Sequence, residues 1–109
     1  MSAPTMGDLS ATVTALASLM ARFPDLPGVA VRITTVYPDL LELAVHDDLA
    51  AFEAWREALD IAPEDVVHGV QSGGTTRVLD VHTVLMGARL RLISFAPIPA
   101  LALGSGVGS

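Results

Sequence analysis

The chain has 109 residues, which is enough for one domain but too few for two domains that each have a proper core. Its hydrophobic fraction of 51% and charged fraction of 17% are typical of a folded protein and argue against disorder over most of the chain. The net charge of −6 predicts repulsion from nucleic acid and anionic membrane surfaces, and the lack of cysteine excludes disulfides and cysteine-bound zinc.

The first predicted element is a helix near the N-terminus with one apolar stripe. Its opposite side, between residues 9 and 21, offers Ser, Thr and Ala and no charge, which is unusual for a solvated helix face. We expect the stripe to face the core, while the smooth side either packs closely against something or is an ordinary exposed face of low charge. The stripe consists of Leu9, Val13, Leu16, Met20 and Phe23.

Two strands are predicted next, over residues 29–34 and 41–46, where apolar and polar residues alternate. In an antiparallel pair their apolar sets share one face only if the connecting loop has an odd number of residues. A loop over residues 37–39 meets that condition and would set Ile33 opposite Leu43.

A second helix is predicted to begin after two aspartates, residues 47 and 48, either of which can cap it, and to end near Ile61. Phe52 and Leu59 recur at helical spacing and should make this helix the main packing element. Trp55 is either a core residue at the edge of that stripe or an exposed anchor for a partner.

Three more strands complete the pattern, over residues 66–71, 75–86 and 88–96. Gly73-Gly74 and Gly87-Ala88 are predicted as two-residue hairpin turns. The first turn would set His68 opposite Leu79, and the second would set Val81 opposite Ser94.

The elements predict an α+β fold in the order α-β-β-α-β-β-β, with a five-stranded antiparallel sheet and both helices on one face. The opposite face would then be too apolar for a fully wetted surface. Its expected residues are Arg32, Glu42, His46, Asp80, His82, Val84, Met86, Arg89, Arg91, Ile93 and Phe95.

The chemistry-bearing residues do not form a recognised motif. His46, His68 and His82 lack the spacing of a metal site, so structural roles are favoured, and no metal or other cofactor is predicted. Asp80 and His82 share one strand face and could act as an oriented base, but no nucleophile accompanies them, and with Arg91 nearby a surface ion cluster is simpler. No catalytic residue is predicted, and the protein is expected not to be an enzyme.

One long segment resembles a group of known sequences. YPDLLELAVHDDLAAFEAWREALDIAPEDVVHG, followed by GTTRVL and GARLRLISFA, is similar to small uncharacterised proteins of Streptomyces-like actinobacteria and their mobile elements. The resemblance covers most of the chain from Val29 to Ala96. It implies a bacterial setting, and because those proteins have no assigned activity it implies no site residues.

The two ends of the chain bear on localisation. The N-terminus lacks the basic region and long apolar stretch of a signal peptide, and Pro97 and Pro99 interrupt the uncharged run after Arg91, so we expect a cytoplasmic protein without a membrane anchor. Residues 1–102 are expected to form the single α+β domain, and the Gly- and Ser-rich residues 103–109 a flexible tail.

The leading functional hypothesis is a non-enzymatic protein interaction or regulatory module. It is expected to form a homodimer through the apolar sheet face, with its arginines near the rim, and to bind an unknown protein partner. In a competing arrangement the first helix forms the dimer contact. The alternative function is a small-molecule or metal-binding protein that uses the histidine-bearing sheet face. The interface candidates are Val84, Met86, Arg89, Arg91, Ile93, Phe95 and Trp55.

Overall fold

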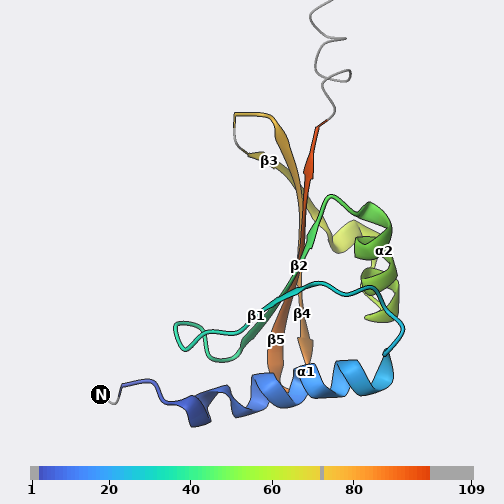
Figure 1. Ribbon diagram of the computed structural model, residues 1–109. Helices are drawn as coiled ribbons and strands as arrows, with labels where there is room; N and C mark the ends of the chain where they lie inside the picture. Colours follow the sequence, from blue (N-terminus) through green and yellow to red (C-terminus); the bar gives the residue numbers. More distant parts are fainter. Residues whose placement is uncertain (1–2, 72, 99–109) are drawn as a thin grey trace, which may run out of the picture.

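A computed structural model describes residues 3–71 and 73–98 of the chain. It confirms an α+β fold with a five-stranded sheet and two helices (Figure 1). Among the described residues, neither helix combines the length and the apolar character needed to cross a membrane. Two short 3-10 helices add to the expected order. The elements are η1 (Met6–Leu9), α1 (Ser10–Arg22), β1 (Ala30–Arg32), β2 (Leu40–His46), α2 (Leu49–Ala58), η2 (Pro63–Asp65), β3 (Val67–Gln71), β4 (Thr76–Leu85) and β5 (Ala88–Pro97).

The sheet is mixed, so the prediction of a purely antiparallel sheet was wrong. The strand order is β1-β2-β5-β4-β3, in which β2 and β5 are parallel and the other pairs antiparallel. The parallel pairing sets Leu41 beside Leu90 and Leu43 beside Leu92. It places the two strands with these fully buried leucines at the centre of the sheet, where burial stabilises the fold most.

Both helices pack against one face of the sheet, as predicted. Leu19 of α1 and Phe52 of α2 belong to the same buried cluster as the inward-facing leucines of β2 and β5. Helix α2 begins where expected, because the Asp48 carboxylate accepts a hydrogen bond from the Ala51 amide at 2.9 Å. The face of the sheet that the helices leave uncovered is called the outer face below.

Helix α1 is rotated from its predicted orientation. Val13 and Met20 of the apolar stripe are 50% and 60% exposed, whereas Thr12, Ala15 and Leu19 are fully buried. Small side chains let the helix approach the sheet closely, and the Thr12 hydroxyl donates a hydrogen bond to the Pro38 carbonyl, so burying it costs little. The buried side of the helix therefore combines Thr12 and Ala15 with part of the predicted stripe, since Leu16 and Phe23 still pack against the core.

The hairpin registers are confirmed in one case and corrected in two. His68 lies opposite Leu79, as the Gly73-Gly74 turn predicted. In the β4–β5 hairpin, Met86 and Gly87 form the turn with φ values of 51° and 80°. The pairing is displaced by two positions relative to the prediction, so Ser94 lies opposite Leu79. The side chains keep their faces because an even displacement preserves the alternation.

The β1–β2 hairpin has a longer loop than predicted. Val31 pairs with Leu43, in the place expected for Ile33, and residues 33–39 form the connection. Within this loop the Tyr37 amide donates to the Thr34 hydroxyl at 3.4 Å, and the Leu40 amide donates to the Tyr37 carbonyl at 3.0 Å. These local hydrogen bonds close the loop and end β1 early.

Candidate functional site on the outer face of the sheet

The centre of the outer face is an ion cluster around Arg91. The guanidinium holds both carboxylate oxygens of Asp80, with Nε 3.0 Å from Oδ1 and Nη2 2.7 Å from Oδ2. Its Nη1 atom lies 3.6 Å from Oε2 of Glu42, and Nε2 of His82 lies 3.7 Å from Oδ1 of Asp80. The predicted grouping of Asp80, His82 and Arg91 is therefore present, and both carboxylate oxygens of Asp80 bind Arg91.

This geometry changes the acidity of the paired groups. Hydrogen bonds from Arg91 hold the pKa of Asp80 below its ordinary value, against the opposing effect of desolvation. The same hydrogen bonds raise the pKa of Arg91. A carboxylate held ionised in this way is a poor candidate for a general base at neutral pH.

The Asp80 pair predicts a pH-dependent part of the stability. Because the folded pKa lies below the unfolded value of about 3.9, the stabilisation is complete above about pH 5 and is lost as the pH falls through the folded pKa. Asp80→Asn should lower the free energy of unfolding by about 1 kcal/mol at pH 7. Urea unfolding at pH 7 and pH 3 should show this difference shrinking in acid. Asp39→Asn is the comparison: Arg89 also lowers the pKa of Asp39, but that ion pair is more exposed, so the effect of this variant should be smaller. A stability loss in Asp80→Asn that does not change with pH would contradict the assignment.

The two interface arginines are both paired within the chain. Arg89 binds Asp39 in a two-pronged contact, with Nε 2.9 Å from Oδ2 and Nη2 3.0 Å from Oδ1. Arg91 is held by Asp80 and Glu42 as described. Both arginines are therefore neutralised within the chain and do not need carboxylates from a partner.

The apolar interface candidates do not form one surface. Val84 and Met86 are 70% and 59% exposed near the β4–β5 turn. Ile93 is only 3% exposed, although it lies on the outer face between Ala44 and Asp80. The exposed apolar surface on the outer face is therefore smaller than the sequence indicates.

Two aromatic candidates are occupied by contacts within the chain. Phe95 is partly buried and stacks on His46, with the ring centroids 5.5 Å apart. Trp55 is 8% exposed, and its Nε1 donates to the Pro27 carbonyl at 2.8 Å. Trp55 is therefore a core residue, and the reading of it as an exposed anchor is wrong.

The three histidines lie apart. His46 stacks on Phe95 and His82 lies beside Asp80, both on the outer face, while His68 lies opposite Leu79 on the helix side of the sheet. Within the part of the chain that the structure describes, no group of three or more His, Asp or Glu residues is arranged to hold a metal ion. The histidine-bearing face thus offers hydrogen-bonding and charged groups.

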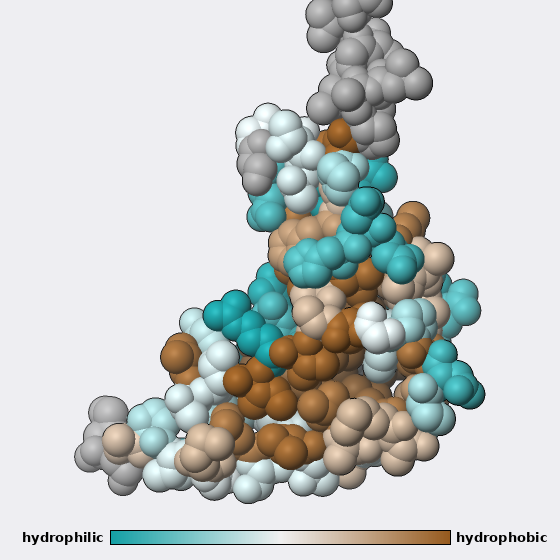
Figure 2. All heavy atoms as spheres, viewed as in Figure 1, coloured by the Kyte–Doolittle hydropathy of each residue, from teal (hydrophilic) through white to brown (hydrophobic). Residues whose placement is uncertain are grey.

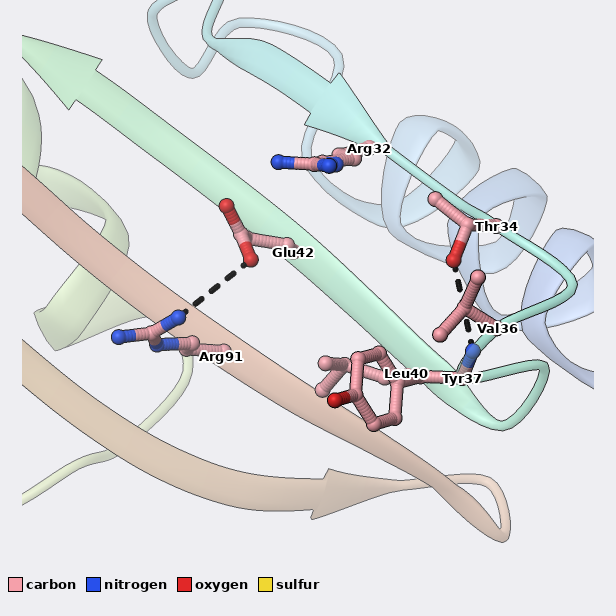
Figure 3. A pocket seen from close by; sticks show the side chains of 7 residues that line it. All are labelled: Arg32, Thr34, Val36, Tyr37, Leu40, Glu42 and Arg91. Carbon is pink, nitrogen blue, oxygen red and sulfur yellow. Dashed lines mark hydrogen bonds and ion pairs between the residues drawn. The ribbon is translucent and has the colours of Figure 1, made fainter.

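A pocket of about 290 Å³ opens on the outer face beside the ion cluster, and we call it the outer pocket (Figure 3). Charged side chains lie at one end, and apolar side chains from the loop between β1 and β2 and from the first residue of β2 lie at the other. Sequence reasoning missed this pocket because the loop was predicted to be shorter. The lining residues are Arg32, Thr34, Val36, Tyr37, Leu40, Glu42 and Arg91.

A larger apolar groove of about 430 Å³ opens on the helix side of the sheet, where α1 leaves β1 uncovered. Figure 2 shows the hydrophobic side chains that gather above α1 in this view. The rotation of α1 creates part of this surface, since it exposes Met20. The groove is lined by Leu16, Leu19, Met20, Phe23, Pro24, Leu26, Pro27, Gly28, Val29, Val31, Leu43 and Trp55.

The chain matches no protein-family model, no curated protein and no solved structure. The outer pocket, the apolar groove and the ion cluster are the features that bear on function.

Proposed function

We propose that the protein is a non-enzymatic interaction module that self-associates, with a second copy of the chain covering the apolar groove. The observation that carries this proposal is the groove itself. Leu19, Leu43 and Trp55 of the buried cluster line the groove from below, so the exposed apolar surface there lies directly over the hydrophobic core. Covering such a surface removes apolar area from water, at about 25 cal/mol for each Å².

Charge favours the groove over the outer face as the contact. Helix α1 has no charged residue before Arg22, and its exposed side therefore meets a second copy without like-charge repulsion. A contact across the outer face would instead bury the cluster of Arg91, Asp80 and Glu42. Desolvating charged groups costs several kcal/mol for each ion unless the new surface compensates.

A two-fold contact fits this surface. In such a dimer the same patch is used by both copies, so each groove would receive apolar side chains from the exposed side of the partner's α1. Met20 and Val31 are 60% and 46% exposed at the groove and supply apolar atoms that a dimer would bury. A dimer contact through the first helix was the competing arrangement in the sequence analysis. It leaves the outer face free.

The proposal predicts a position-specific effect on oligomeric state. Light scattering and sedimentation should show dimers for the wild type, and Met20→Arg should give monomers because it places a charge at the groove. Arg has helix propensity similar to Met, so the exposed substitution should preserve the fold. Val84→Arg is the matched control, because Val84 is 70% exposed on the outer face and should leave the dimer intact.

Circular dichroism on both variants separates a lost contact from a lost fold. Monomers from Val84→Arg together with dimers from Met20→Arg would move the contact to the outer face. A wild-type protein that stays monomeric at high micromolar concentration would contradict self-association through either surface.

A further inference from the structure

Arg32 differs from Arg89 and Arg91 in having no partner among the described residues. Within the described part of the chain it makes no hydrogen bond or ion pair, although its neighbour across the β1–β2 ladder is Glu42. The Glu42 carboxylate lies instead toward Arg91, with Oε2 3.6 Å from Nη1 (Figure 3). The guanidinium of Arg32 therefore lines the outer pocket with its donors free.

The outer pocket has a charged end and an apolar end. Val36, Leu40 and Tyr37 supply apolar and aromatic surface at the end away from Arg32 and Glu42. Val36 is 74% exposed and Tyr37 59%, so an occupant could still cover much of both side chains. A guanidinium with free donors binds a carboxylate through two parallel hydrogen bonds, and an aromatic ring adds contact to a flat apolar group.

We propose that the outer pocket binds a small carboxylate with an apolar or aromatic body, its carboxylate on Arg32 and its body against Tyr37, Val36 and Leu40. This chemistry is shared by a free apolar amino acid and by the C-terminal residue of a peptide. The volume of about 290 Å³ is at the small end of ligand pockets and suits one residue of that kind. The proposal is independent of self-association, because the groove lies on the other face of the sheet.

The two sources differ in what they present to Glu42. A free amino acid carries an ammonium group that the Glu42 carboxylate can bind, whereas a peptide end carries a neutral amide. Phenylalanine therefore represents the first source and N-acetyl-phenylalanine the second. N-acetyl-phenylalaninamide has the same body without the carboxylate and serves as the chemical control.

The test is a titration of the full chain with each probe, followed by amide NMR shifts. We expect saturable shifts centred on residues 32–42 with at least one of the two carboxylates and none with N-acetyl-phenylalaninamide. Arg32→Gln should weaken the binding about tenfold or more, because it removes the charged hydrogen-bond donors. Arg77→Gln is the matched control, since this exposed arginine lies on β4 outside the pocket, and it should leave the affinity within about twofold.

The outcomes are distinguishable. Tighter binding of phenylalanine identifies a free amino acid as the ligand class, and tighter binding of N-acetyl-phenylalanine identifies a peptide end. Equal binding of the amide, or an affinity unchanged by Arg32→Gln, would overturn the carboxylate assignment. The absence of saturable shifts with both carboxylates would overturn the site, and no result with these probes depends on whether the protein dimerises.

Discussion

Phe52→Ala is expected to lower the free energy of unfolding by about 3 to 5 kcal/mol, because the ring is lost from the core and a cavity remains. Phe52 is 1% exposed and belongs to the cluster that joins α2 to β2 and β5. Domains of this size have a total stability of about 5 to 15 kcal/mol, so the variant should be close to unfolding. Urea denaturation followed by circular dichroism measures the loss.

Leu49→Ala on the same helix is the matched control. Leu49 is 56% exposed, so truncating it should change the stability by less than about 0.5 kcal/mol. A melting temperature of Phe52→Ala within a few degrees of the wild type would show that α2 does not pack on the sheet through this residue.

Substitution of Trp55 is expected to give the second large loss of stability. Two variants separate the contribution of its packing from that of its hydrogen bond. Trp55→Ala should cost about 3 to 5 kcal/mol, because Trp55 is 8% exposed and packs in the core. Trp55→Phe keeps most of the apolar contact but removes the donor to the Pro27 carbonyl, and should cost about 1 kcal/mol for the hydrogen bond plus a smaller packing loss. Thermal and urea unfolding of the series measure both parts.

Tyr37→Phe provides the control for removing a polar group from an aromatic side chain at a surface. Tyr37 is 59% exposed, and we expect a change of less than about 0.5 kcal/mol. If Trp55→Ala were as stable as the wild type, Trp55 would be a surface residue, as one reading of the sequence allowed. In that case the wall of the apolar groove that Trp55 forms would also have to be reassigned.

The short strand β1 is common to both proposed surfaces. Successive side chains of a strand point to opposite faces, so Val31 faces the groove while Arg32 faces the outer pocket. The substitutions Met20→Arg and Arg32→Gln therefore test the two surfaces separately. Neither alters a residue of the buried cluster.

The sequence determined most of the local structure of this protein. The period of two assigned the faces of β2, β4 and β5 correctly, because displacing a hairpin by two residues changes partners without changing faces. The two candidate capping aspartates, of which Asp48 makes the cap, and the apolar spacing that includes Phe52 placed the start of α2 and its buried side. The ion cluster could also be predicted from the sequence, since Asp80, His82 and Arg91 share one face at neighbouring positions.

The tertiary structure decided the features that depend on contacts distant in the sequence. The parallel pairing of β2 with β5 joins strands separated by α2 and a hairpin, and no turn signal specifies it. The rotation of α1 follows from the fit of Thr12 and Ala15 against the sheet, which outweighs the exposure of Val13 and Met20 because small side chains allow close packing. That rotation and the early end of β1 together leave the apolar groove open on one face and the outer pocket, with the free guanidinium of Arg32, on the other.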